Sequence, residues 1–171
     1  MDIPCRKTVR LQSYDYSSPG TYFVTICTQE RKCILSDITV GAIHESPAVR
    51  LTDAGRCVQS VIVALPERYP SLTLDKYVIM PNHVHLLISI AEERAIRESP
   101  LRQEGKRALL GKAVGYLKMN SSKQIHALAP DLRVWQRSFH EHIVRGEKDY
   151  REIWEYIDSN PAKWSEDRYY E

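Results

Sequence analysis

Short blocks of hydrophobic residues, separated by turn residues, predict several strands along the chain. Runs of about four to eight residues that are rich in β-branched and aromatic side chains are typical of strands. The turn Ser17-Ser18-Pro19-Gly20, for example, precedes such a run. We expect strands at residues 21–28, 72–80, 84–90 and 134–143, and a shorter, irregular one within residues 33–50.

Helical spacing of apolar residues predicts three helices. The first opens at Leu51-Thr52-Asp53, and Pro66 is expected to mark its end. The second covers residues 106–127 and the third residues 147–160. Pro161 is expected to end the third helix, because the residue before a proline avoids helical geometry.

The order of these elements predicts an α+β fold, with helices packed on an antiparallel β-sheet. The step Pro81-Asn82 is either a turn between two strands or a bulge within one long bent strand. The 171 residues, 43% of them hydrophobic, suffice for one compact core and are few for two. We therefore expect a single domain over residues 1–171, with a basic N-terminal arm at residues 1–13 and a short C-terminal tail at residues 162–171.

Composition excludes several classes of protein and favours few. No run approaches the roughly 20 apolar residues that cross a bilayer, and residues 1–10 lack an apolar signal core, so we expect a cytoplasmic protein without a membrane partner. The four cysteines show no CxxC spacing, which argues against a disulfide framework or a thiolate zinc site. The net charge of +2 is compatible with a nucleic-acid partner but is too small to indicate one.

Two histidine pairs are the first candidates for chemistry. In a strand, side chains two residues apart point to the same side, so His83 and His85 converge while Val84 faces the core. This arrangement suits two nitrogen ligands of one metal, although a surface pair without a ligand has the same pattern. His140 and His142 repeat the spacing, and a second metal there would indicate a two-metal hydrolase.

The segment around the first pair, residues 78–88 (VIMPNHVHLLI), resembles the histidine-hydrophobic-histidine (HUH) motif of the single-tyrosine transposases. Three further blocks resemble the REP-associated tyrosine transposases in the same order along the chain: residues 14–25, residues 135–143 and residues 156–161. The resemblance implies a ferredoxin-like or RRM-like HUH nuclease fold. It also implies that His140 and His142 are not the metal pair.

This resemblance implies an active site and a reaction. The nucleophile of the family lies in a Tyr-Ile-x-x-Asn-Pro segment, which places it at Tyr156. His83, His85 and Asn160 would hold the metal, and an amide oxygen suits Mg²⁺ or Mn²⁺ better than zinc. Residues four apart share a helix face, so Glu152, Tyr156 and Asn160 form one polar line. The implied activity is that of a DNA transposase and single-strand endonuclease, which rejoins strands through a 5′-phosphotyrosine intermediate.

The implied partner is single-stranded or hairpin DNA, and basic side chains are the candidates for phosphate contacts. The sequence leaves open whether the protein is a monomer or a homodimer, and whether Tyr156 acts in its own chain or in a partner's. A non-catalytic nucleic-acid-binding module and a metal-dependent phosphoesterase that uses water remain alternatives. A replication initiator or relaxase ranks lower, because those chains are usually larger. The candidate DNA contacts are Arg6, Lys7, Arg10, Lys112, Lys118 and Arg137.

Overall fold

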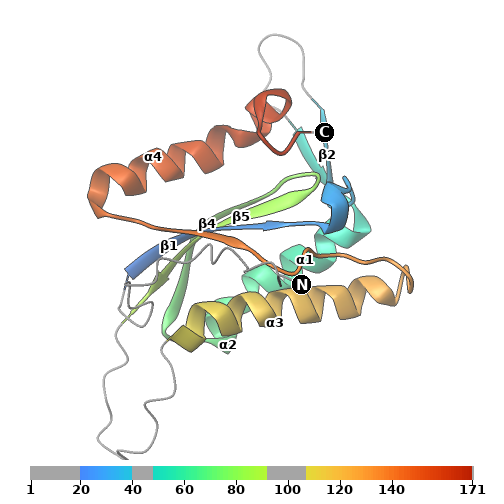
Figure 1. The fold of residues 1–171 in the computed structure, drawn as a ribbon, viewed down its shortest axis with the longest axis horizontal. Coiled ribbons are helices and arrows are strands. Elements are labelled where there is room, and N and C mark those ends of the chain that lie inside the picture. Colours follow the sequence, from blue (N-terminus) through green and yellow to red (C-terminus); the bar gives the residue numbers. More distant parts are fainter. Residues whose placement is uncertain (1–19, 40–47, 92–106, 171) are drawn as a thin grey trace, which may run out of the picture.

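A four-stranded antiparallel sheet forms the centre of the molecule (Figure 1). The computed structural model describes residues 20–39, 48–91 and 107–170. Each strand pairs with its neighbours in antiparallel orientation, in the order β4-β5-β1-β6. The strands are β1 (Gly20–Cys27), β4 (Leu72–Ile79), β5 (His83–Ile90) and β6 (His140–Ile143).

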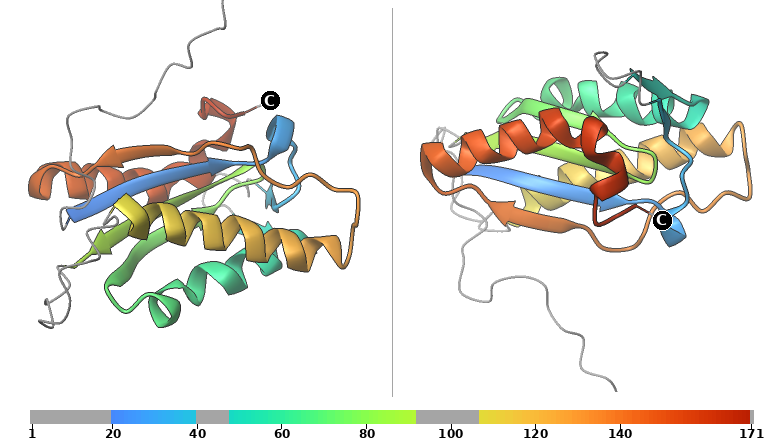
Figure 2. Two further views of the ribbon diagram at one scale, coloured as in Figure 1. Left: turned by 60° about the horizontal axis from the view of Figure 1, so that its bottom comes forward. Right: turned by 90° about the horizontal axis from the view of Figure 1, so that it is seen from above.

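Helices cover both faces of this sheet (Figures 1 and 2). Helices α1 (Asp53–Val63) and α3 (Arg107–His126) lie side by side on one face, and α4 (Gly146–Ser159) crosses the other. The short helix α2 (Leu65–Arg68) follows α1. None of the helices in the described part of the chain has the length and apolar character needed to cross a membrane.

The main elements follow the order strand, helix, strand, strand, helix, strand, which is the ferredoxin-like arrangement, with α4 added at its end. A two-stranded antiparallel sheet of β2 (Ser36–Thr39) and β3 (Ala48–Leu51) is inserted between β1 and α1. The predicted α+β fold with an antiparallel sheet is therefore confirmed.

The alternation of side chains divides the apolar residues into two clusters. On one face Val24 pairs with Leu86, and both are buried with the apolar sides of α1 and α3 in the main core. On the other face Phe23 pairs with Leu87, which packs under Ile153 and Ile157 of α4. The sheet therefore has no apolar face open to water, and the smaller cluster holds α4 in place.

The start of α1 is fixed by a side-chain cap from Thr52 and by the close packing of Gly55 against the backbone at Leu35. The Thr52 hydroxyl accepts a hydrogen bond from the Gly55 amide at 3.0 Å, which satisfies one of the free amides of the first turn. A Cβ atom on Gly55 would lie 1.9 Å from the Leu35 carbonyl oxygen. Only glycine fits at this point between the helix and the chain entering β2.

Several predicted boundaries need correction. The strand predicted at residues 134–143 is confined to β6, and Trp135 forms only an isolated bridge with Thr28, since the residues between turn away to meet α3. Pro66 lies in the first turn of α2, where proline is tolerated, because α1 has already ended at Val63. The predicted end of the last helix is confirmed, since α4 ends at Ser159, but Asn160 before the proline keeps helical backbone angles. Pro161 lies in the first turn of a 3₁₀ helix, η2 (Asn160–Glu166), that follows directly.

The step Pro81-Asn82 is a turn, since β4 and β5 pair with each other on either side of it. The predicted basic arm at residues 1–13 lies outside the described residues.

Candidate active site

The two histidines of β5 lie on the same side of the sheet, as their spacing predicts, and this side faces Tyr156 of α4. Val84 between them is fully buried in the main core on the opposite side of the sheet. His83 and His85 are themselves 0% and 1% exposed, so the pair is sealed from solvent and is not a surface pair. Their Nε2 atoms lie 3.0 Å apart.

Hydrogen bonds at the far side of each ring hold the two Nε2 atoms in this position. The Asn82 amide nitrogen donates to the Tyr169 carbonyl at 2.7 Å, which leaves its oxygen facing His83 Nδ1 at 2.8 Å. Because that oxygen only accepts, His83 Nδ1 carries the hydrogen and Nε2 keeps its lone pair. The Thr25 hydroxyl, on the neighbouring strand, lies 2.9 Å from His85 Nδ1.

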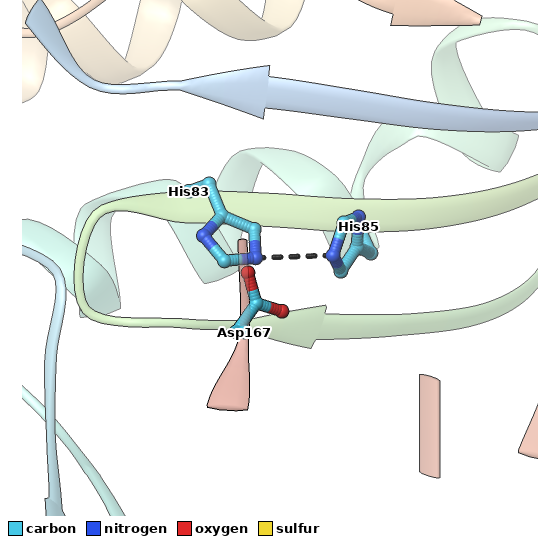
Figure 3. Close-up of side chains that lie close together, drawn as sticks. All are labelled: His83, His85 and Asp167. Carbon is cyan, nitrogen blue, oxygen red and sulfur yellow. Dashed lines mark hydrogen bonds between the residues drawn. The ribbon is translucent and has the colours of Figure 1, made fainter. Parts of the chain in front are cut away.

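Burial lowers the pKa of both histidines below the ordinary histidine range. For His85, the neighbouring His83 lowers the pKa further, because two adjacent positive charges repel each other. Both imidazoles are therefore neutral near pH 7. In the metal-free protein the two Nε2 atoms share a hydrogen bond of 3.0 Å, which His85 donates to the lone pair of His83 (Figure 3). A cation that displaced this hydrogen would meet a nitrogen lone pair from each ring.

Tyr156 lies on the face of α4 that looks towards this pair. Its ring packs edge-on against Phe23, with the ring centroids 5.9 Å apart. Its hydroxyl is 3.4 Å from His85 Nε2 and donates a hydrogen bond to Asp167 Oδ2 at 3.3 Å. Burial, followed by the charge of Asp167, raises the pKa of Tyr156 to about 12, so the phenol is protonated at neutral pH.

Asn160 lies one helical turn after Tyr156 and is 3% exposed. Its amide nitrogen donates to Asp167 Oδ2 at 3.0 Å. Its side-chain oxygen is buried and has no hydrogen-bond partner in the part of the chain that the structure describes, which is costly for a polar atom. The predicted polar line along α4 is present, since Glu152, Tyr156 and Asn160 all line one hollow of about 500 Å³.

Asp167 is the residue at this site that sequence reasoning missed. Its carboxylate faces the two imidazoles in Figure 3, and one ligand atom from each of His83, His85 and Asp167 lies within 4.8 Å of the others. Asp167 is 82 residues beyond His85 and lies in a segment expected to be a short tail. The one available signal was the aromatic content of that segment, Trp164, Tyr169 and Tyr170, which is unusual for a tail in water.

These side chains suit a divalent cation. They offer two neutral imidazole nitrogens, a carboxylate and a buried amide oxygen that lacks a donor. The set of nitrogen and oxygen atoms is of the kind that binds divalent metal ions in proteins.

The second histidine pair has a different setting. His140 and His142 are exposed on β6, the edge strand, and His142 Nε2 pairs with the Asp149 carboxylate at 2.9 Å. In the described residues, the only group of three potential metal-binding side chains is the one around His83. A second metal centre at His140 and His142 thus has no support in this part of the chain.

The candidate DNA contacts fall into three groups. Lys112 and Arg137 are exposed. Lys118, in contrast, donates from its ammonium group to the carbonyl oxygens of Gln136, Arg137 and Ser138, so it joins α3 to the segment before β6. The remaining candidates, Arg6, Lys7 and Arg10, lie outside the described residues.

Comparison with known proteins gives matches along most of the chain. No family model matches. An uncharacterized protein of Haemophilus influenzae strain Rd is 34% identical over 173 residues, which cover 96% of this chain and 93% of that protein. A second protein of the same organism, assigned as a REP-associated tyrosine transposase, is 31% identical over 153 residues, which cover 87% of this chain and 74% of its own.

A solved structure supports the fold independently. A REP-associated tyrosine transposase bound to a REP hairpin superimposes with a TM-score of 0.54, covering 85% of this chain and 68% of that one, at 21% sequence identity. At this identity the likeness shows the fold, whereas the relative at 31% identity shows the family. This chain therefore belongs to the REP-associated tyrosine transposases.

Proposed function

We propose that this protein cleaves and rejoins single-stranded DNA through a covalent bond between Tyr156 and a 5′-phosphate, with the help of Mg²⁺ or Mn²⁺. The observation that carries the proposal is the 3.4 Å separation between the Tyr156 hydroxyl and His85 Nε2. A nucleophile belongs beside the metal ligands, because the same phosphate must meet both. Tyr150 lies more than a turn away on α4, and Tyr170 is exposed.

His83, His85 and Asn160 would hold the cation, with Thr25 and Asn82 fixing the two rings. When bound, the cation would polarise the target phosphate and neutralise charge that develops on its oxygens. The Asn160 oxygen supports this assignment, because a cation would satisfy a buried acceptor that no donor among the described residues reaches.

The protein's own residues hold the nucleophile ready for attack. Phe23 contacts one edge of the Tyr156 ring, and the hydrogen bond to Asp167 orients the hydroxyl. In cleavage, the Tyr156 oxygen gives its proton to water and bonds to phosphorus. The bond from phosphorus to the 3′-oxygen breaks, and that oxygen takes a proton from water to become a 3′-hydroxyl. Rejoining reverses these changes, so no nucleotide cofactor is required.

The proposed substrate is a single strand next to a hairpin. The relative whose fold matches is bound to a REP hairpin, which supports this class of DNA. Lys112, Arg137 and the basic arm with Arg6, Lys7 and Arg10 are proposed as phosphate contacts. Lys118 is left out, because its ammonium group is already occupied by three carbonyl oxygens.

The test is a search for the covalent adduct. Labelled single-stranded DNA with a pool of hairpins is incubated with the protein and Mg²⁺ or Mn²⁺, then separated on a denaturing gel. We expect an adduct with the wild type and with the control Tyr170→Phe, whose tyrosine is 52% exposed in the tail. Tyr156→Phe and His83→Ala should give none.

The other outcomes favour the alternative functions. DNA binding without an adduct across the pool would indicate a non-catalytic binding module. Cleavage that survives Tyr156→Phe would indicate a phosphoesterase that uses water.

A further inference from the structure

The segment after α4 closes over the histidine pair and forms part of the site. We call residues 160–170 the C-terminal segment. Tyr169 in this segment is 4% exposed, and its ring centroid lies 4.7 Å from that of His83. Its carbonyl accepts the hydrogen bond that orients Asn82, and through Asn82 it sets which nitrogen of His83 carries the hydrogen. The C-terminal segment thus sets the tautomer of His83, one of the proposed metal ligands.

Asp167 is held in this segment with its carboxylate towards the histidines (Figure 3). Its Oδ1 accepts from the Tyr169 amide at 2.7 Å, and its Oδ2 accepts from Asn160 at 3.0 Å and from Tyr156 at 3.3 Å. These bonds come from three positions and fix the orientation of the carboxylate. A preorganised carboxylate beside two neutral imidazoles is a common arrangement of metal ligands.

The balance of charge favours an anionic ligand from the protein. His83, His85 and Asn160 are neutral donors, and each is almost completely buried. Before a DNA phosphate binds, a doubly charged cation held by these three alone would keep its full charge beside buried side chains, which is unfavourable without a nearby opposite charge. Of the three clustered residues, only Asp167 brings a negative charge.

The geometry points to Asp167 as a direct ligand of the metal. This inference rests on the proposed metal site, and it assigns the carboxylate ligand to the C-terminal segment. The metal is then bound by two parts of the chain that are far apart in sequence, β5 and the C-terminal segment. Metal binding should therefore restrict the motion of the C-terminal segment relative to β5.

The first test measures metal binding without DNA. Mn²⁺ is titrated into the full-length protein, and the free ion is followed by electron paramagnetic resonance. We expect Asp167→Asn and Asp167→Ala to raise the Kd for Mn²⁺ at least about tenfold, since even residues behind the direct ligands typically contribute about 10–100-fold. Asp131→Asn, which removes an exposed carboxylate outside the hollow that holds Asp167, should leave the Kd unchanged.

A second test uses only the wild-type protein and does not depend on the folding of any variant. Mn²⁺ should slow amide hydrogen exchange in residues 161–170, because ligation by Asp167 anchors that segment to β5. Unchanged exchange in this segment on saturation with Mn²⁺, or a Kd for Asp167→Asn within twofold of the wild type, would overturn the assignment. A wild-type protein that does not bind Mn²⁺ would overturn it as well.

These results are separable from the proposed strand transfer. Mn²⁺ binding that depends on Asp167, without any DNA adduct, would support the ligand and count against the strand-transfer activity. A DNA adduct, together with a Kd for Mn²⁺ that is unchanged by substitution of Asp167, would support the strand-transfer activity and count against Asp167 as a ligand.

Discussion

The Tyr156 hydroxyl lies 3.4 Å from His85 Nε2 of the same chain. One chain thus contains both the proposed nucleophile and the proposed metal ligands. The arrangement is held by the packing of Ile153 and Ile157 on Leu87 and by the ion pair between Lys76 and Asp158 at 2.6 Å. Helix α4 begins at Gly146, whose φ of 84° is a turn conformation that favours glycine, so the chain reverses there and returns over its own sheet.

We therefore predict that Tyr156 acts on DNA at its own chain's metal site. A mixture of Tyr156→Phe and His83→Ala proteins should form no more DNA adduct than either alone, because each chain lacks one half of the site. The adduct is quantified on a denaturing gel against an equal amount of wild type. Recovery of adduct in the mixture would mean that α4 exchanges between two chains.

Asn82→Ala should weaken Mn²⁺ binding by about 10–100-fold, although Asn82 contacts no metal. Without its side chain, His83 Nδ1 loses its acceptor and the hydrogen is free to move to Nε2, the atom needed for the metal. The matched control is Asn120→Ala on α3, because the Asn120 amide donates to the Tyr116 carbonyl of its own helix at 2.9 Å. Equal Mn²⁺ affinity in the two variants, measured by titration, would contradict this role for Asn82.

The metal-free protein should lose stability as the pH falls below about 6.5. Burial depresses the pKa of His83 and His85 in the folded state, whereas an unfolded chain protonates them near the ordinary value of about 6.5. The unfolded state therefore binds more protons in this range, and the free energy of unfolding falls by up to about 1.4 kcal/mol per pH unit for each histidine.

Urea unfolding in the presence of a chelator, at pH 7.5, 6.5 and 5.5, measures this effect. The double variant His83→Gln, His85→Gln should show a flatter pH dependence than the wild type. A parallel dependence in both proteins would show that other groups govern acid stability.

Lys118→Met should destabilise the protein by about 2–3 kcal/mol, because three carbonyl oxygens lose their donor. Lys112→Met, on the exposed side of the same helix, should change the free energy of unfolding by less than about 0.5 kcal/mol. Urea unfolding of both variants checks the difference. If Lys118→Met instead matched Lys112→Met in stability and lost DNA binding, Lys118 would belong among the phosphate contacts.

Gly55→Ala should cost about 3 kcal/mol, because the added Cβ would lie 1.9 Å from the Leu35 carbonyl and force α1 away from the chain entering β2. Gly115→Ala is the matched control, since nothing lies within 4 Å of a Cβ at that position of α3. There, alanine should stabilise the helix by about 0.5–1 kcal/mol. Opposite signs in urea unfolding are expected, and equal effects would contradict the close approach at Gly55.

The sequence by itself predicts the parts of this protein that depend on local periodicity. Alternation along residues 83–90 places His83 and His85 on one face, and the helical repeat places Tyr156 and Asn160 on one line. Such relations follow from backbone geometry alone, because they involve neighbours within one strand or one helix. The order of the elements likewise predicts an antiparallel α+β fold, and four ordered blocks indicate the family.

Contacts between distant parts of the chain were decided only by the tertiary structure. No sequence spacing relates Asp167 to His85, and nothing local shows that the carbonyl of Tyr169 orients Asn82. Lys118 is likewise indistinguishable from a surface lysine until α3 meets the segment at residues 136–138. Whether α4 folds back over its own sheet depends on packing against Leu87, which a local pattern does not encode. The sequence therefore identifies the two histidines and the tyrosine, while tertiary packing decides what surrounds them.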